Sequence, residues 1–319
     1  MTLRLITLVF LSILLSSSCT GEGGFFDAEP VTVGIAAGEG ETRTSMLPNG
    51  LSARWETGDE IAVWALNSSG TSALEAQKFV AYGLDSGHGF FTSTLASPMP
   101  DDIYTYYACY PFPESYDGTS ATFTIPDIQD GRVSGGADLM IASLVQHGPL
   151  TPIADPDNHS GMSLQMNHML HQFRFYIPGT ESAIIADHQI TRLELTFPKP
   201  VAGKVTYRLS EPSAPVSTKL DKNSIILQLQ HPMAVSSELD YTCVAFAPTS
   251  FELGESLKIR AFTSDKIAVV DPVDLCARNF EPGHSTPVRL LIKEFIDYPY
   301  AITFTLDGNY VGENVWMFP

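Results

Sequence analysis

The sequence has few basic residues, and this shortage excludes some partners. Its 18 lysines and arginines stand against 36 aspartates and glutamates, so the formal net charge is -18. Such a surface repels phosphate groups, which makes nucleic acid and anionic lipid headgroups poor partners. Beyond its first residues the chain also lacks an apolar run of about 20 residues, the length that crosses a bilayer as a helix.

The sequence also lacks the motifs of common enzyme chemistry. It contains no Gly-x-Ser-x-Gly elbow, P-loop or dinucleotide fingerprint. His168, His171 and Asn167 could suggest a metal site, but strand residues three apart point to opposite faces. The Asp155–Asn158 stretch lacks the glycine and the distal glutamate of an EF-hand calcium loop. We therefore expect no metal, no cofactor and no enzymatic activity.

Cysteine is scarce, with four in the chain. Cys109, Cys243 and Cys276 follow the N-terminal Cys19, and three is an odd number for disulfide pairing. The pair Cys243–Cys276 is the preferred disulfide, because both residues fall in the C-terminal half. Buried, unbonded thiols that pack as small hydrophobic groups are an equal alternative.

The N-terminal segment has the pattern of a secretory signal. Arg4 precedes the largely apolar run Leu5–Leu15, and three serines then lead to Cys19. A cysteine at this place is typical of lipoprotein processing, in which acylation tethers the new N-terminus to a bilayer. Ser16 stands where a lipobox usually has leucine, so an ordinary signal peptide with a chance cysteine is the alternative. We expect residues 1–18 to be removed and Cys19 to carry the lipid (palmitate).

The dominant hydrophobic period along the chain is two. In Val31–Ala37, for example, valine and isoleucine alternate with smaller or polar residues, which predicts a strand with one buried face. With 24 glycines and 22 prolines between short segments, the pattern predicts an all-β protein of antiparallel β-sandwich architecture. Helix is expected only in short pieces, near Ala137–Ser143 or Ser182–His188. Similar alternation recurs in the segments Ile61–Leu66, Phe90–Leu95, Tyr104–Tyr110, Ala121–Ile125, Phe173–Ile177, Thr191–Phe197, Lys204–Leu209, Tyr241–Ala247, Leu257–Phe262 and Val288–Ile292.

The length predicts two domains, each large enough for its own core. The polar, proline-broken segment Gly148–Gly161 is the best candidate for a boundary. We therefore expect an N-terminal domain over 19–155, a C-terminal domain over 156–296 and a tail over 297–319.

The alternation changes phase just after this boundary. Leu164 and Met166 share one parity, whereas Phe173 and Phe175 share the other. A bulge or kink between the two pairs would let all four side chains enter one core.

Short motifs follow one another in order along almost the whole chain. They are Thr42–Thr44, Trp55, Gly58–Asp59, Ile61, Val63, Tyr106–Tyr107, Tyr110–Pro111, Asp138–Met140, His168, Leu170, Phe173–Ile177, Phe280, Pro282–His284 and Val288–Ile292. Together they resemble the fimbrillins, the type V pilus subunits and their relatives. The resemblance implies two tandem transthyretin-like sandwiches in a non-enzymatic pilus component or adhesin at the cell outer membrane. It also implies other pilus subunits as partners, and a host or bacterial surface ligand as a further one.

Pilus subunits of this kind need an incomplete sandwich that a neighbour completes. A missing strand exposes a hydrophobic groove and unpaired backbone groups, which a strand from another subunit can fill. Val31–Ala37 is the candidate for the strand that first occupies the groove. In the tail, Ile302, Phe304 and Leu306 share one face and form the candidate donor strand. The turn signal Asp307–Asn309 leaves open that the tail is instead a closed hairpin.

The segment between the first strand and Trp55 is small, polar and suited to proteolysis. Because shaft pilins of the family are matured by an arginine-specific protease, the resemblance implies cleavage after Arg43, with Arg54 as the lesser candidate. The alternative is that Arg43 is a solvated loop residue and the lipid anchor is retained.

Carbohydrate binding by a monomeric surface lipoprotein is the alternative function. Trp55, Trp64, Trp316 and the Tyr104–Tyr110 cluster could provide stacking platforms for sugars. Trp55 and Trp64 flank a tight turn between alternating strands, so most of these aromatic side chains are expected to be core or edge cover.

Overall fold

The computed structural model describes residues 29–39, 55–85, 88–132, 137–142, 144–153, 162–179, 185, 188–234, 241–297, 305–306 and 309–310. Their regular structure is β-strand nearly throughout, from β1 to β26, as the alternating pattern predicts. The helix expected near Ala137–Ser143 is wrong, because Met140–Ala142 forms strand β9 and pairs with two neighbours. No helix in the described part of the chain is long and apolar enough to span a membrane.

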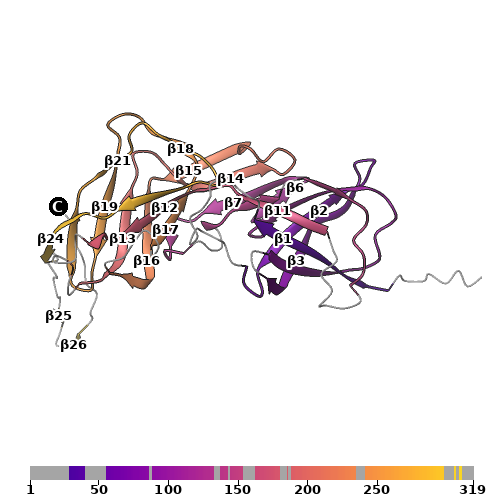
Figure 1. Cartoon of the computed structure of the whole chain (residues 1–319), viewed down its shortest axis with the longest axis horizontal. Helices are drawn as coiled ribbons and strands as arrows, with labels where there is room; N and C mark the ends of the chain where they lie inside the picture. The colour runs from indigo at the N-terminus through magenta and orange to yellow at the C-terminus, as the bar shows by residue number, and fades with distance from the viewer. Residues whose placement is uncertain are drawn as a thin grey trace, which may run out of the picture.

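The N-terminal half forms one eight-stranded sheet, on the right of Figure 1. β5 pairs not only with β2 and β10 but also with β9, so the sheet closes on itself. The strands are, in spatial order, β10 (Val145–His147), β5 (Tyr104–Tyr110), β2 (Glu60–Leu66), β3 (Ser72–Asp85), β4 (His88–Leu95), β1 (Val31–Glu39), β11 (Met162–His168) and β9 (Met140–Ala142).

The other strands form several smaller sheets, which extend from the left to the middle of Figure 1. The largest runs β24 (Ile292–Asp297), β20 (Lys266–Val270), β19 (Ser256–Phe262), β13 (Ile190–Thr196), β16 (Ser224–Met233) and β8 (Ile128–Gln129), and β21 (Val273–Asp274) pairs with β19. The others are β15 (Ser217–Lys222), β14 (Ala202–Arg208), β7 (Ser120–Ile125) and β6 (Ser115–Asp117); β17 (Thr242–Phe246), β12 (His171–Tyr176) and β23 (Ser285–Arg289); β18 (Thr249–Ser250) and β22 (Asn279–Phe280); and β25 (Thr305–Leu306) and β26 (Asn309–Tyr310).

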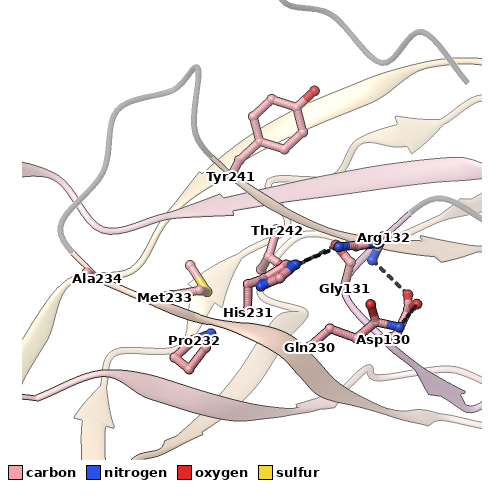
Figure 2. A pocket seen from close by; sticks show the side chains of 10 residues that line it. All are labelled: Asp130, Gly131, Arg132, Gln230, His231, Pro232, Met233, Ala234, Tyr241 and Thr242. Carbon is pink, nitrogen blue, oxygen red and sulfur yellow. Dashed lines mark hydrogen bonds between the residues drawn. The ribbon is translucent and has the colours of Figure 1, made fainter. Parts of the chain in front are cut away.

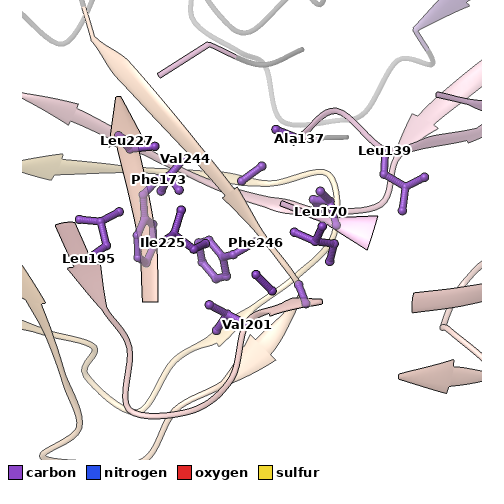
Figure 3. Packing of buried hydrophobic residues seen from close by; sticks show 14 of the residues in the cluster. Ala137, Leu139, Leu170, Phe173, Leu195, Val201, Ile225, Leu227, Val244 and Phe246 are labelled. Carbon is purple, nitrogen blue, oxygen red and sulfur yellow. The ribbon is translucent and has the colours of Figure 1, made fainter. Parts of the chain in front are cut away.

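Two clusters of buried side chains follow this division in part. One is formed by residues of the eight-stranded sheet and includes Ile61, Phe79 and Phe91. The other gathers residues from the smaller sheets together with other residues of β2, β5 and β9. In it Phe173 and Phe246 pack together with ring centroids 4.7 Å apart (Figure 3). Burial of such large apolar side chains is the main stabilising contribution of each half.

Strand pairing crosses the boundary expected at residues 155 and 156 in both directions. β11, which follows it, pairs with β1 and β9 of the N-terminal sheet. β7 and β8, which precede it, pair with β14 and β16 of the C-terminal half. The division into 19–155 and 156–296 therefore stays a prediction. Within the chain, the sheets of each half include strands from the other side of this boundary.

The phase change after the expected boundary has a different cause from the one predicted. β11 ends at His168, and Met169 and Leu170 lead directly into β12 in another sheet. Leu164 and Met166 belong to the first buried cluster, whereas Phe173 and Phe175 belong to the second. The prediction of a bulge serving a single core is wrong, because the chain passes from one core to the next.

The three described cysteines are free thiols, so the predicted disulfide Cys243–Cys276 is wrong. Cys109 and Cys243 are buried, and burial raises the pKa of the Cys243 thiol to about 12. Cys276 is exposed and lies at a positive φ of 56°. The alternative of small buried hydrophobic groups therefore describes two of the three.

Candidate subunit interface: strand β1 and the groove it fills

Strand β1 lies inside the N-terminal sheet rather than at its edge. Val31–Gly38 pairs with β4 in antiparallel register, and Ile35–Glu39 pairs with β11 in parallel register. The prediction that Val31–Ala37 forms a strand within this sheet is confirmed. Because both edges of β1 are used, its removal would leave two rows of backbone groups without partners.

Besides β4, the first half of β1 has a neighbour that is not a strand, residues 152–153. Val33 forms an isolated antiparallel bridge with Pro152, and the Ile153 amide donates to the Thr32 carbonyl at 2.9 Å. Gly34 has no side chain here, and a Cβ atom would come within 2.2 Å of the Ile153 Cδ1 atom. The segment before residue 154 therefore closes over β1 where β11 does not reach.

One face of β1 packs into the N-terminal core. Val33 and Ala37 are fully buried and Ile35 is 3% exposed, in the same cluster as Phe91 of β4 and Leu164 of β11. The intervening Thr32, by contrast, is exposed. Burying a valine or isoleucine side chain contributes roughly 1.5–3 kcal/mol, so β1 supports a substantial share of this core.

A tight turn positions aromatic residues that pack beside β4, the neighbour of β1. Gly58 has a φ of 97°, which glycine adopts readily, and the Glu56 amide donates to Asp59 Oδ2 at 2.7 Å. Trp55 precedes this turn and packs edge-on against Phe91 with ring centroids 5.0 Å apart. The backbone of Gly89 in β4 lies so close that a Cβ atom there would come within 2.8 Å of the Trp55 ring. The sequence analysis missed Gly89, whose only signal was its place opposite an alternating strand.

The aromatic residues considered as sugar platforms are mostly in the core. Trp55 is 5% exposed and Trp64 1%, and Tyr104 and Tyr106 are also buried. The Tyr106 hydroxyl donates to the Gly148 carbonyl at 2.9 Å, and burial raises the pKa of this phenol. The expectation that these side chains pack internally is confirmed, and Trp316 lies outside the described residues.

The two histidines considered as metal ligands have separate protein partners. His168 Nδ1 lies 2.6 Å from Asp138 Oδ1, and both side chains are buried. His171 shares one hydrogen bond with the Glu281 carbonyl at 2.8 Å and another with Thr286 Oγ1 at 3.0 Å. Burial lowers the pKa of His171 to about 4, which keeps the ring neutral. Within the described ranges, no group of three histidine, cysteine or acidic side chains is arranged to hold a metal ion.

Most of the processing and donor residues lie outside the described part of the chain. Cys19, Arg43, Ile302 and Phe304 are in this group. Leu306 belongs to β25, which pairs with β26 through Thr305 with Tyr310 and Leu306 with Asn309. This short antiparallel pair is the arrangement that the closed-hairpin alternative predicts.

Comparison with known proteins identifies the family. The chain matches the fimbrillin-like family model over residues 42–275, which is more than half of its length. The chain belongs to the fimbrillin-like family. β1 and the tail lie outside the matched residues, so what is said of them depends on the structure of β1 and on the sequence of the tail. None of the curated proteins matches the sequence.

One solved structure, that of a protein from Bacteroides uniformis, extends the likeness to the fold of this fimbrillin-like chain. A putative cell adhesion protein from Bacteroides uniformis is 17% identical, with a TM-score of 0.50 over 83% of this chain and 97% of that one. A fimbrial assembly protein from Parabacteroides distasonis is 8% identical, with a TM-score of 0.39 over 85% and 99%. The fimbrial anchor protein Mfa2 from Porphyromonas gingivalis is 12% identical, with a TM-score of 0.27 over 85% and 98%. At these identities the likeness concerns fold alone.

Proposed function

We propose that this fimbrillin-like protein is a non-enzymatic pilus subunit or adhesin of the cell surface that assembles by strand exchange. The observation that carries the proposal is the place of β1, between β4 and β11 with Val33, Ile35 and Ala37 in the core. We also infer that each half is a transthyretin-like sandwich. The inference is supported by the presence of two buried clusters, of which the second also includes residues of β2, β5 and β9.

Replacement of β1 is physically reasonable because its contacts are of a kind that another strand can reproduce. They consist of backbone hydrogen bonds on both edges and apolar side chains at every second position. β1 is joined to the next described residue, Trp55, through residues 40–54, so a cut in that segment would separate it from the sheet. The groove would then accept a strand with the same alternation.

The tail is the proposed donor. Ile302, Phe304 and Leu306 repeat the spacing of Val31, Val33 and Ile35, so they would present one apolar face to the groove. The pairing of β25 with β26 involves two residue pairs, and a donor tail would have to open it. We therefore propose that Tyr300–Pro319 acts in trans, as a partner for the groove of another subunit.

Lipidation and proteolysis would set where and when assembly occurs. We propose that Cys19 carries a lipid in the outer membrane and that cleavage after Arg43 releases β1 together with that anchor. An anchor subunit would instead keep both, and the two outcomes differ in the N-terminus of the mature protein. Sequencing that N-terminus from surface-isolated protein distinguishes them.

The experiment is limited digestion of the purified full-length protein with an arginine-specific protease. We expect a new N-terminus at Thr44 by mass spectrometry, followed by a concentration-dependent ladder on native gels. Arg43→Ala should prevent both results, whereas Arg54→Ala serves as the matched control and should prevent neither. An acylated Cys19 in assembled material, or a ladder formed equally by uncut protein, would contradict the proposal.

A second test concerns the donor. Deletion of Tyr300–Pro319 should leave a folded protein that is cut normally but forms no ladder. An excess of a synthetic peptide with the β1 sequence Val31–Glu39 should also suppress the ladder of the intact protein, because it refills the groove. Normal polymerisation by the deletion variant would exclude the tail as the donor.

The carbohydrate alternative loses its original basis. Trp55 and Trp64 are buried, so neither offers a ring face to a sugar. We therefore do not propose a tryptophan platform.

A further inference from the structure

A pocket in the C-terminal half combines basic, polar and apolar walls. It has a volume of about 280 Å³ and lies between the segment after β8 and the facing ends of β16 and β17. Figure 2 shows Asp130 and Arg132 on one side, with His231 and Met233 on the other. Drug-sized ligands occupy pockets of roughly 300–1,000 Å³, so this one suits a ligand of monosaccharide size.

The Arg132 side chain is exposed and bonds to His231 across the pocket. Its Nη2 donates to His231 Nε2 at 2.6 Å, which requires that this ring nitrogen carry no proton. Among the described residues no carboxylate lies within ion-pair distance of Arg132, although acidic residues outnumber basic ones twofold in the chain. A guanidinium has five N–H donors in a planar fork, so most of them stay available to a ligand.

Asp130, the acidic side chain among the residues that line the pocket, is hydrogen-bonded to two neighbouring residues. Asp130 Oδ1 accepts from the Arg132 amide at 2.9 Å, and Oδ2 accepts from Gln230 Nε2 at 3.0 Å. These bonds fix Asp130 as an acceptor without placing it on the Arg132 guanidinium. It can therefore receive a ligand hydroxyl while the guanidinium keeps its positive charge for an anion.

A second guanidinium adds positive charge behind the pocket wall. Arg174 lies over the ring of Tyr241, with its guanidinium carbon 5.1 Å from the ring centroid. Its Nε atom is buried without a hydrogen-bond partner among the described residues. Tyr241 lines the pocket, whereas Arg174 is not among the residues that line it. With Arg132 and Asp130 both in its wall, the pocket can meet an anionic group and a hydroxyl group of one ligand with separate side chains.

We propose that this pocket binds a carboxylate-bearing monosaccharide, the chemistry shared by uronic acids and sialic acids. The carboxylate would accept two parallel N–H bonds from Arg132, the arrangement that gives arginine its selectivity for planar anions. Asp130 and Gln230 would bind ring hydroxyls, and Pro232 and Met233 would contact the apolar face of the ring. The site would give this surface protein a glycan ligand independently of strand exchange.

The test compares ligands that differ in the carboxylate alone. Calorimetry on the full chain should show glucuronate binding at least tenfold more tightly than glucose, because glucose lacks the group that Arg132 recognises. N-acetylneuraminate, measured beside it, distinguishes a terminal sialic acid from a uronic acid as the source of the carboxylate. Equal affinity for glucuronate and glucose, or no binding of either acid at millimolar concentration, would overturn the proposal.

Variants locate the site. Arg132→Gln should lower the affinity for the acidic sugar at least tenfold, and Arg132→Lys should restore part of it because the charge returns without the fork. Arg278→Gln is the matched control, since Arg278 lines a separate pocket and is not part of this one. Thermal unfolding midpoints equal to that of the parent protein show that the variants fold. An Arg132→Gln protein that folds and binds normally would overturn the proposal, and its failure would leave the strand-exchange tests unaffected.

Discussion

Strands β1 and β12 are paired in the same way but are connected differently. Each is flanked by one antiparallel and one parallel neighbour: β4 and β11 for β1, and β17 and β23 for β12. β12 follows β11 after Met169 and Leu170 alone, whereas β1 is followed by residues 40–54 before the next described residue. The two strands are therefore alike in their pairing, and in the proposed exchange it is the segment 40–54 after β1 that would be cut to release it.

The side chains of the two strands also differ. Phe173 of β12 packs among Phe246, Phe280 and Phe197, with ring centroids 4.7, 5.1 and 6.1 Å away. The buried side chains of β1 are Val33, Ile35 and Ala37, which are smaller and aliphatic. Aromatic packing depends on specific ring geometry, whereas a row of aliphatic groups is easier for another sequence to reproduce.

The largest expected effect concerns β12, the strand that keeps its place when β1 is exchanged as proposed. Phe173→Ala should lower the free energy of unfolding by about 3–5 kcal/mol, the usual cost of removing a buried phenylalanine side chain. Chemical denaturation should give the same loss before and after cleavage, because β12 remains in place. Lys219→Ala, at an exposed position, is the control and should change stability by less than about 0.5 kcal/mol. A loss that appears only in the uncut protein would break the contrast between the two strands.

The next largest effect concerns β1, the strand proposed to be exchanged. Ile35→Ala should lower the free energy of unfolding of the uncut protein by about 2–3 kcal/mol, because it leaves a cavity in the N-terminal core. After cleavage and release of β1, the same substitution should have no effect on the stability of the assembled form. Thr32→Ala, on the exposed face of β1, should be nearly neutral in both states. A cost of Ile35→Ala that persists in assembled material would mean that β1 is retained.

A smaller effect is the pH dependence of stability that His171 of β12 gives to its half of the molecule. His171 of β12 has its pKa lowered to about 4 from the usual 6.5, so the folded state favours the neutral ring. The resulting stability is fully present above pH 6.5 and is lost as the pH falls toward 4, with about 2–3 kcal/mol lost by pH 4.5. Unfolding curves of His171→Gln should show a correspondingly shallower pH dependence between pH 7 and 4.5. The exposed His147→Gln should keep the parent slope, and an unchanged slope in His171→Gln would contradict the prediction.

The sequence predicts the strands better than their neighbours. Alternation correctly marks Val31–Ala37 as a strand with one buried face, since that pattern is local. It does not predict that β1 lies between β4 and β11, because both pairings join residues far apart in the chain, and the pairing with β11 joins residues more than a hundred positions apart. The helix expected near Ala137–Ser143 failed for the same reason: the pairing of β9 with β5 and β11 overrides local preference.

The pocket could not have been found from the sequence at all. Arg132 and His231 are 99 residues apart, and neither belongs to a motif. The contact arises because β8 pairs in parallel with β16, which brings the segment after β8 beside the end of β16. Single polar residues in loops carry no local signal of the partners that the fold gives them.

The covalent continuity of β1 with the rest of the chain has a kinetic consequence. A strand that stays covalently joined to the rest of its chain competes for its site at an effective concentration that can reach the millimolar range. A rival strand on a separate molecule, present at far lower concentration, would rarely displace it. Self-association would then depend on a single bond-breaking event rather than on how much protein accumulates, and the intact precursor could be stored and transported without sticking to its own kind.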